Sequence, residues 1–358
     1  MNPITRTLRL LFVSIIFGKL SMAQAQKQLP QYNPELRFIH HREDWKGNPI
    51  VKGMYVNHEF PQMNGFKDVL KWKRMKNPYE KLKKMDTFEM PIKVDSVIFD
   101  KSQDGIFWLG HATFLIRFGG KQFITDPVFK KAAVVKRHSK LPVKIKELPE
   151  SDIVLMSHDH RDHCDKNSLR KLRKQNPEIQ YYSGLNMDKL LKKYLRKAPG
   201  QTAGWFQQYN TQGLGFELYF LPTRHWSKRG LFDTNKRLWG SFILVIDGVT
   251  IYFGGDSGYG SHYKEIATLF PHIDYAILGI GAYEPEWFME SNHSSPAKSY
   301  QAFLDLNAQH LIPMHYGTFD LSDEPIGYPI QVLEDIKKRE GDSRIVIPSL
   351  GENLFNSK

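Results

Sequence analysis

The residues of this chain best suited to chemistry lie in one short stretch. An apolar run at residues 153–156 is followed at once by SHDHRDHCD, residues 157–165. Imidazole and carboxylate groups are the ligands that zinc and its first-row neighbours accept in proteins. Open α/β sheets place their sites at the carboxyl ends of strands. The stretch therefore predicts a buried strand that ends in a metal site, rather than a polar surface loop that happens to hold three histidines.

Three later apolar runs also end near a possible ligand. Residues 217–221 lead to His225, residues 249–253 to Asp256, and residues 310–314 to His315. A single histidine after a strand is more often structural than ligating. Repetition at several strand ends favours a shared metal centre.

Two predicted hairpins position part of this set. Residues 113–118 and 121–125 are joined by Gly-Gly, and residues 242–246 and 249–253 by Asp-Gly. Both dipeptides are typical of tight β-turns. The first hairpin ends in Asp126 and the second leads to Asp256, which suggests an internally duplicated architecture.

The remaining pattern predicts one α/β domain over residues 101–358, with regular structure beginning near Ile106. Helices are expected from a cap at Asp165 to just before Pro177, over 189–197, from a Ser-Pro cap at 295–296 to Leu306, and over 330–339. Further strands are expected at 107–109, 217–221, 275–278 and 310–314, with a closing strand at 344–347.

The N-terminal hundred residues differ from the rest. Residues 1–25 have a basic start, an apolar run and an Ala-Gln-Ala cleavage pattern, which predict an export signal, with an amphipathic or anchoring helix as the alternative. The expected location is the bacterial periplasm or a peripheral position on a membrane. Residues 26–100 are predicted to form a basic extension that packs on the main domain. That extension is either a solvated wrap or a basic, aromatic-bearing surface facing anionic lipid.

The overall composition limits the partners. The 358 residues carry a formal net charge of +12, which favours an anionic phospholipid surface, a phosphate-bearing substrate or nucleic acid. The one cysteine, Cys164, excludes an intramolecular disulfide and a cysteine zinc cluster.

Taken together, these motifs resemble the metallo-β-lactamase superfamily. The resemblance rests on the histidine motif of residues 158–163 with His225, Asp256 and His315. One branch, which contains the N-acyl-phosphatidylethanolamine-hydrolysing phospholipase D, is resembled by further motifs: WLGHAT (108–113), TDP (125–127), LWGS (238–241), GDSGY (255–259), YEPEWFM (283–289) and HYGTF (315–319). The resemblance implies a four-layer αββα sandwich with duplicated halves.

The resemblance also implies two divalent metal ions, with zinc expected and iron or manganese as alternatives. Its ligand set is His158, His160 and His225 for one ion, Asp162, His163 and His315 for the second, and Asp256 between them. A metal-bound hydroxide would be the nucleophile, and Asp162 would orient it or accept its proton. Asp159 is not expected to bind metal.

Three further residues receive supporting roles. His111 and Asp126 are expected to fix ligand orientation by hydrogen bonds. His293 is expected to contact the substrate or leaving group, with a structural histidine at a helix start as the alternative.

The function predicted first is a phospholipase D that cleaves N-acyl-phosphatidylethanolamine to N-acylethanolamine and phosphatidic acid. The alternatives are a lactonase, phosphate-ester hydrolase or nuclease on the same scaffold, or a non-catalytic metal- or lipid-binding protein. A phospholipid substrate and an anionic membrane surface are the expected partners. Nucleic acid is not expected, since export would separate the chain from it, and a homo-oligomer is left open.

Overall fold

The computed structural model describes residues 29–40, 45–57, 59 and 65–355. The predicted export signal at residues 1–25 lies outside this part, so export stays a prediction. Among the described residues, no helix has the length and apolar character needed to cross a bilayer.

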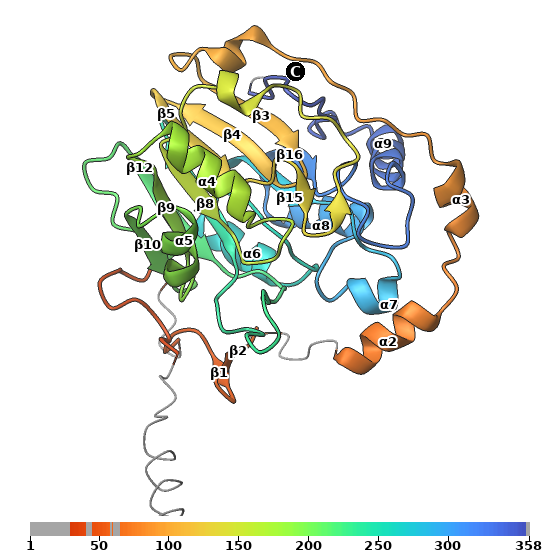
Figure 1. Cartoon of the computed structure of the whole chain (residues 1–358), viewed down its shortest axis with the longest axis horizontal. Coiled ribbons are helices and arrows are strands. Elements are labelled where there is room, and N and C mark those ends of the chain that lie inside the picture. The colour runs from red at the N-terminus through yellow and green to blue at the C-terminus, as the bar shows by residue number, and fades with distance from the viewer. Residues whose placement is uncertain (1–28, 41–44, 58, 60–64, 356–358) are drawn as a thin grey trace, which may run out of the picture.

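Two six-stranded sheets form the centre of the molecule (Figure 1). The first has the spatial order β10-β9-β8-β5-β4-β3 and consists of β3 (Gly105–Gly110), β4 (Thr113–Phe118), β5 (Lys121–Thr125), β8 (Ile153–Met156), β9 (Gln180–Gly184) and β10 (Gly200–Ala203). The second has the order β11-β12-β13-β14-β15-β16 and consists of β11 (Gln207–Gln208), β12 (Phe216–Leu221), β13 (Ser241–Ile246), β14 (Val249–Phe253), β15 (Ile273–Gly279) and β16 (Ala308–Met314).

The two sheets repeat one plan. In the first, β3, β4 and β5 pair antiparallel, and β8, β9 and β10 then add in parallel. In the second, β12, β13 and β14 pair antiparallel, and β15 and β16 add in parallel. This repetition confirms the predicted duplication.

Alternate side chains of a strand belong to different hydrophobic clusters, one on each face of the sheet. In β8, Val154 and Met156 join a cluster with Leu169 of α4, whereas Ile153 and Leu155 join the cluster shared with the second sheet. Successive residues of a strand point to opposite faces, so one strand supplies both layers. The sheets therefore pack on each other through their inner faces and against helices through their outer faces.

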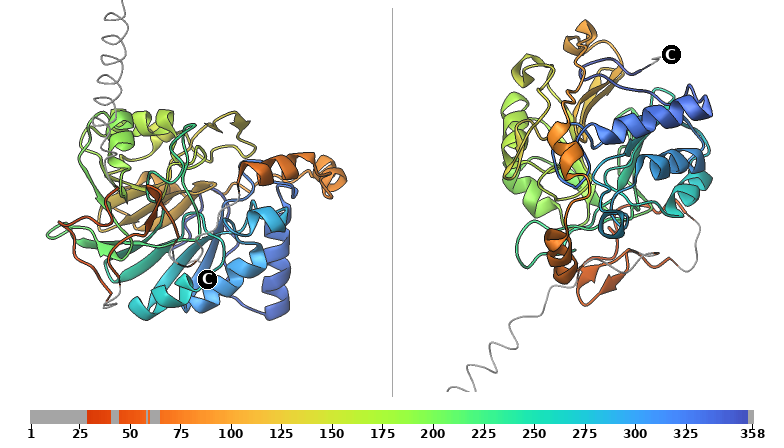
Figure 2. Two further views of the ribbon diagram at one scale, coloured as in Figure 1. Left: turned by 90° about the horizontal axis from the view of Figure 1, so that it is seen from below. Right: turned by 90° about the vertical axis from the view of Figure 1, so that its right-hand side faces the viewer.

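The helices of the two halves lie on opposite outer sides (Figure 2). Those of the first half are α4 (Lys166–Gln175) and α5 (Asp188–Tyr194), and those of the second are α6 (His262–Leu269), α7 (Glu286–Met289), α8 (Pro296–Asp305) and α9 (Tyr328–Glu340). The result is the predicted αββα sandwich.

Local turn and cap signals are confirmed where they were strongest. The Gly119-Gly120 and Asp247-Gly248 turns both have two residues with positive φ, as two-residue hairpins require. The Asp165 carboxylate accepts a hydrogen bond from the backbone N–H of Ser168 at 2.8 Å and so caps α4.

The prediction that regular structure begins near Ile106 is wrong. Within the described residues, four elements precede it: β1 (Ile50–Val51), β2 (Met54–Tyr55), α2 (Phe66–Arg74) and α3 (Glu80–Met85), followed by a 3₁₀ turn η1 (Ser96–Phe99). The extension lies against the main domain, where the Asn77 side chain donates to the backbone carbonyl of Asp323 and the Tyr79 hydroxyl donates to Glu284. Its helices have few buried residues, which is why periodicity did not reveal them.

Two later boundaries also differ. The helix expected over 189–197 ends at Tyr194, because Arg196 and Lys197 adopt positive φ. The closing strand at 344–347 is wrong: Ile345 makes a single bridge to Leu311 at the edge of β16. Two short hairpin strands, β6 (Lys131–Ala132) and β7 (Val135–Lys136), and a 3₁₀ turn η2 (Ile145–Glu147) complete the described elements.

Candidate metal centre

The predicted ligands meet where strands of both sheets end. The histidine motif follows β8 of the first sheet, while His225, Asp256 and His315 follow β12, β14 and β16 of the second. The chain turns sharply at these ends, since Asp126 and His315 both have positive φ. Such backbone costs of the order of 1–3 kcal/mol per non-glycine residue and is concentrated at functional sites.

One group of nitrogens belongs to His158, His160 and His225. The Nδ1 atom of His160 lies 2.9 Å from Nε2 of His158 and 3.1 Å from Nε2 of His225. His225 donates its Nδ1–H to the backbone carbonyl of Asn292 at 3.0 Å, so its Nε2 carries a lone pair. Nitrogens that share one tetrahedral zinc ion lie about 3.3 Å apart, given bonds of about 2.0–2.1 Å. The three nitrogens are therefore spaced as ligands of one cation.

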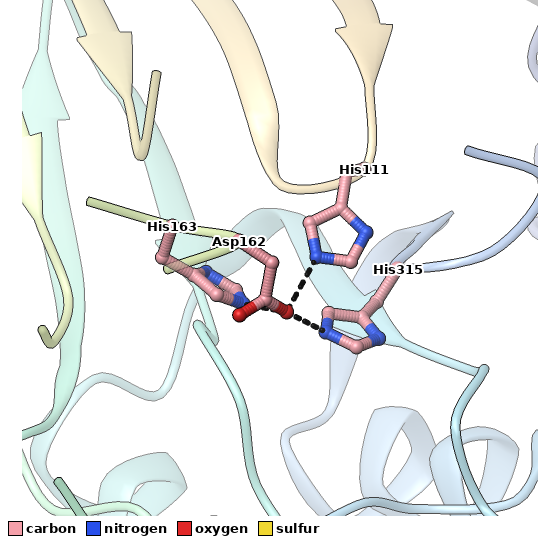
Figure 3. Close-up of side chains that lie close together, drawn as sticks. All are labelled: His111, Asp162, His163 and His315. Carbon is pink, nitrogen blue, oxygen red and sulfur yellow. Dashed lines mark hydrogen bonds and ion pairs between the residues drawn. The ribbon is translucent and has the colours of Figure 1, made fainter. Parts of the chain in front are cut away.

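A second group surrounds Asp162 (Figure 3). Its Oδ2 atom lies 3.0 Å from Nε2 of His111 and 3.5 Å from Nε2 of both His163 and His315. All four side chains offer a donor atom within 4.8 Å of the others.

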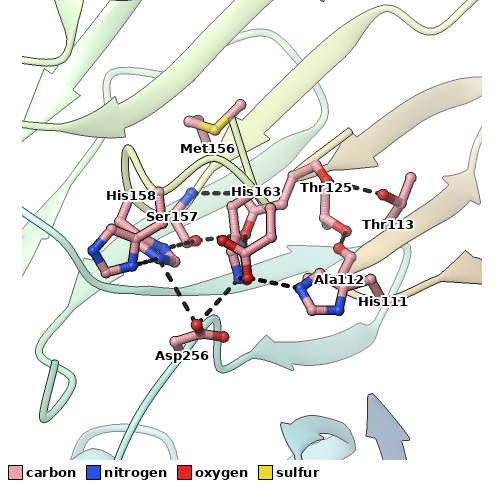
Figure 4. Close-up of polar contacts among 12 residues, drawn as sticks. His111, Ala112, Thr113, Thr125, Met156, Ser157, His158, His163 and Asp256 are labelled. Atoms are coloured by element: carbon pink, nitrogen blue, oxygen red, sulfur yellow. Dashed lines mark hydrogen bonds and ion pairs between the residues drawn. The ribbon is translucent and has the colours of Figure 1, made fainter. Parts of the chain in front are cut away.

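Asp256 lies between the two groups (Figure 4). Its Oδ2 atom is 3.1 Å from Nε2 of His163 and 3.3 Å from Nε2 of His315 on one side. On the other side it is 3.7 Å from Nε2 of His225 and 3.8 Å from Nε2 of His158. This position is the one that a ligand shared by two cations would occupy.

The protonation states of these residues fit the same interpretation. Burial alone would raise the pKa of Asp162 and Asp256, but the neighbouring imidazoles, His163 foremost, hold both pKa values well below the ordinary range. Burial alone would lower the pKa of His315, but Asp256 and Asp162 raise it to about 9. Burial lowers the pKa of His158 well below its usual range, and the adjacent histidines add to this effect. Protons and cations therefore compete for these nitrogens.

Within the described structure, several buried atoms of the site make no well-aligned hydrogen bond, although Asp256 has the ion-pair contacts given above. They are Nε2 of His160, His163 and His315 and both carboxylate oxygens of Asp256. Leaving buried polar atoms unsatisfied is costly unless another group satisfies them. Divalent cations suit this donor set, which contains only imidazole nitrogens and carboxylate oxygens.

Asp126 makes three hydrogen bonds to the histidine stretch. Its carboxylate accepts from the backbone N–H of Ser157 at 2.8 Å, from the Ser157 hydroxyl at 2.5 Å, and from Nδ1 of His163 at 2.8 Å. The Ser157 Oγ atom lies 2.8 Å from Nδ1 of His158 in turn. These bonds direct the Nε2 atoms of His158 and His163 into the site.

His111 and His293 both lie beside His315, with ring centroids 4.0 and 5.1 Å from its ring. His111 is buried beside Asp162. It lies within the second donor group itself, whereas its predicted role was only to support a ligand by a hydrogen bond. The Nδ1 atom of His293 lies 3.8 Å from Oδ2 of Asp256, and its side chain is partly exposed.

Asp159 and Cys164 lie in the histidine stretch but belong to neither donor group. Asp159 is buried, and its Oδ2 atom is 2.6 Å from the Arg237 guanidinium, outside every donor group of the described structure. Burial raises the pKa of the Cys164 thiol to about 12, so it is a poor nucleophile at neutral pH.

A pocket of about 430 Å³ opens beside these donors. His160, Asp162, Asp256 and His293 line its inner end. Its walls and rim come from residues that sequence reasoning did not assign to the site: Val69, Trp72, Arg161, Trp226, Lys228, Ala282, Phe288, Met289, Asn292 and Leu321. The aromatic residues of the basic N-terminal stretch were the available signal for Trp72. A larger groove of about 710 Å³ is lined by most residues of the segments 35–37, 208–217 and 245–247. None of the donors lines this groove.

Comparisons with known proteins agree with this geometry. The profile of the β-lactamase superfamily domain matches residues 121–316. The N-acyl-phosphatidylethanolamine-hydrolysing phospholipase D 1 of Caenorhabditis elegans is 32% identical over 271 residues, covering 70% of this chain and 76% of that protein. The mitochondrial protein of that activity from Saccharomyces cerevisiae is 31% identical over 296 residues, covering 75% of this chain and 60% of the yeast protein.

A solved structure also has the same fold. A possible metal-dependent hydrolase from Veillonella parvula superposes with a TM-score of 0.57 at 16% identity, covering 70% of this chain and 98% of the other.

Proposed function

Because the chain belongs to the metallo-β-lactamase superfamily and is a metal-dependent hydrolase, we propose that it is a phospholipase D-type phosphodiesterase. The proposed substrate is N-acyl-phosphatidylethanolamine, and the products are N-acylethanolamine and phosphatidic acid. The relatives in nematode and yeast support this substrate. The alternatives on the same scaffold differ in substrate rather than in fold.

The observation that carries the proposal is that the pocket has an apolar wall on one side and charged and metal-capable groups on the other. Val69, Trp72 and Phe288 provide an apolar wall, while Asp162 and His293 lie at the inner end. Lys228 and Arg161 add positive charge. A phospholipid has the same two sides, an acyl chain and an anionic phosphodiester. The volume of about 430 Å³ lies in the range of ligand pockets and would hold part of such a molecule.

We assign one cation to His158, His160 and His225, the other to Asp162, His163 and His315, and Asp256 to both. When bound, divalent cations supply an acidified water at neutral pH and neutralise charge on a phosphate oxygen. Zinc is the cation we propose, because the donors are imidazole and carboxylate.

The chain's own residues orient the reactants. The Asp162 carboxylate lines the pocket and can accept a proton from attacking water. His293 faces the same space and can donate a hydrogen bond to the leaving-group oxygen. Asp126 and Ser157 hold the His158 and His163 rings in one orientation throughout.

The proposal is tested by incubating the metal-replete protein with N-acyl-phosphatidylethanolamine in detergent micelles. Mass spectrometry should detect N-acylethanolamine and phosphatidic acid in equal amounts. Chelation should abolish both products, and added zinc should restore them. A His158→Ala variant should lose bound metal and activity together.

A parallel panel of a lactone, a soluble phosphodiester and single-stranded RNA separates the alternatives. Intact phospholipid together with rapid turnover of one panel member would reject the phospholipase and keep the hydrolase. Metal binding without turnover of any substrate would favour a non-catalytic binding protein.

A further inference from the structure

The loop between β12 and β13 displays two large apolar side chains in water. Leu231 is 83% exposed and Phe232 is 92% exposed. The loop is nevertheless well held, because the Asp233 carboxylate accepts from the backbone N–H groups of Arg229 and Gly230 and pairs with Arg237 at 2.8 Å. A fixed loop therefore holds both side chains where they contact little of the protein.

Helix α2 and the start of α7 carry a second set of exposed apolar groups. Leu70 and Met75 border a shallow groove on α2, and Trp287 of α7 is 40% exposed. Helices α2 and α7 lie near each other (Figure 1). Trp72 of α2 stacks on Phe288 of α7, with ring centroids 5.1 Å apart. The Lys71 ammonium lies 4.3 Å from the centre of the Trp287 ring.

Sequence neighbours of both sets line one pocket. Trp72 of α2 and Lys228, three residues before Leu231, both line the 430 Å³ pocket. Phe288, the neighbour of Trp287, lines it as well. The exposed apolar residues are therefore carried by the same three segments that supply wall residues of the pocket beside the metal centre.

Basic side chains lie near these exposed apolar residues. Helix α2 exposes Lys67, Lys71, Lys73 and Arg74 against one acidic residue, Asp68. Arg161 and Lys228 are also exposed beside the pocket. The nearby acid Glu286 is paired with Lys298 at 3.1 Å. The surface of these segments is therefore cationic as well as apolar.

We propose that this surface, the docking rim (Leu70, Met75, Leu231, Phe232 and Trp287 with the basic residues of α2), seats the protein on an anionic phospholipid bilayer. The inference rests on the proposed lipid substrate and adds how the pocket reaches it. Apolar side chains enter the region between head groups and acyl chains, and lysines and arginines attract anionic head groups. A nucleic acid would use the charges but would leave Leu231 and Phe232 in water.

The test is co-sedimentation of the metal-replete full chain with vesicles that contain no substrate. Vesicles of phosphatidylserine and phosphatidylcholine should bind the protein more tightly than vesicles of phosphatidylcholine alone. Leu231→Ser/Phe232→Ser should weaken binding about tenfold or more, because two large side chains no longer leave water. Lys67→Gln/Arg74→Gln should weaken binding to anionic vesicles roughly fivefold for each charge removed.

Matched controls come from a different groove, which contains Phe99, Lys146 and Lys171. Phe99 is 44% exposed, and both lysines are exposed. Phe99→Ser and Lys146→Gln/Lys171→Gln should bind vesicles like the wild type. The Leu231→Ser/Phe232→Ser variant should retain its metal content and its turnover of a soluble substrate, which excludes misfolding as the cause.

Equal vesicle binding by the wild type and Leu231→Ser/Phe232→Ser would overturn the proposal. Equal losses in the rim and control variants would overturn it too, as would binding of RNA but not of vesicles. Because the vesicles lack substrate, their binding is measured independently of phospholipase activity. If the docking-rim variants bind vesicles as expected but the protein does not cleave N-acyl-phosphatidylethanolamine, only the proposed substrate is rejected.

Discussion

At the scale of single residues, the metal centre depends on how each ring is held. Asp126 binds Ser157 and His163, and Ser157 contacts His158. One buried carboxylate thus orients a nitrogen in each of the two donor groups. Neutral imidazoles have two tautomers, and the outer hydrogen bond decides which nitrogen faces the metal.

Asp126→Asn should lower metal affinity or activity about 10–100-fold. The amide keeps the shape of the carboxylate but has one acceptor oxygen. Either the Ser157 backbone N–H loses its acceptor, or the Ser157 hydroxyl and His163 both lose theirs. Metal titration with a chromophoric chelator would measure the change. Asp165→Asn is the matched control, because that carboxylate caps a helix and asparagine caps equally well. Unchanged metal affinity in Asp126→Asn would contradict the assigned role.

His111→Asn tests whether this buried ring supports the site or binds metal. His111 has φ near +54°, and asparagine tolerates that backbone conformation. With His111 as a support for Asp162, the variant should still bind two ions per chain but with lower activity. Elemental analysis that finds one ion per chain would instead make His111 a ligand.

The ligand set could be proposed from sequence because each ligand follows an apolar run. The pocket wall could be proposed only in part: Phe288 and Met289 lie in the YEPEWFM motif, but Val69 and Trp72 lie in no motif. Val69 and Trp72 form a single pair at helical spacing in a lysine-rich segment, too few residues to define a buried face. Their partner Phe288 is more than 200 residues away in sequence, and only the folded chain brings them together.

At the scale of elements, α4 fixes the loop that carries four of the predicted ligands. Its N-cap, Asp165, accepts from the Ser168 N–H and hydroxyl, both at 2.8 Å. The Ser168 hydroxyl oxygen accepts in turn from the backbone N–H of Phe129 at 2.9 Å. The cap therefore connects the histidine loop to the segment after β5.

Asp165→Ala should lower the free energy of unfolding by about 1 kcal/mol, because the first turn of α4 loses a hydrogen-bond acceptor. Asp165→Asn should lie within a few tenths of a kcal/mol of the wild type. Urea denaturation of the metal-replete proteins measures both. Equal stabilities of the alanine variant and the wild type would show that the cap contributes nothing.

Elements with a local signal were predictable, and elements defined by distant contacts were not. The Gly119-Gly120 and Asp247-Gly248 hairpins depend on turn residues within a few positions. The segment at 344–347 has the apolar residues of a strand, but it meets the edge of β16 at one residue only. Whether such a segment forms a strand depends on how many residues pair with the adjacent strand, and the composition of the segment does not determine that number.

At the scale of the whole molecule, buried tyrosines limit stability in alkali. Burial raises the pKa of Tyr181, Tyr182 and Tyr263 to about 12. The unfolded chain loses these protons near pH 10. The native state therefore holds more protons between about pH 10 and 12, and stability falls as pH rises through that window.

Chemical denaturation at a series of pH values should show a falling midpoint above about pH 10. Tyr182→Phe should reduce the slope, since phenylalanine has no hydroxyl to ionise. A slope that is the same in the variant and the wild type would assign the loss to other groups.

The division of ligands between the two sheets has one more consequence. The first half supplies His158, His160, Asp162 and His163, and the second supplies His225, Asp256 and His315, so neither half holds a complete site. A bound cation is therefore a crosslink between the halves. Ligands that bind only the native state add about 2.7 kcal/mol at a free concentration one hundred times Kd. Metal supply would thus affect the stability of the folded chain as well as its activity, and a metal-starved cell would be expected to lose folded protein along with the activity.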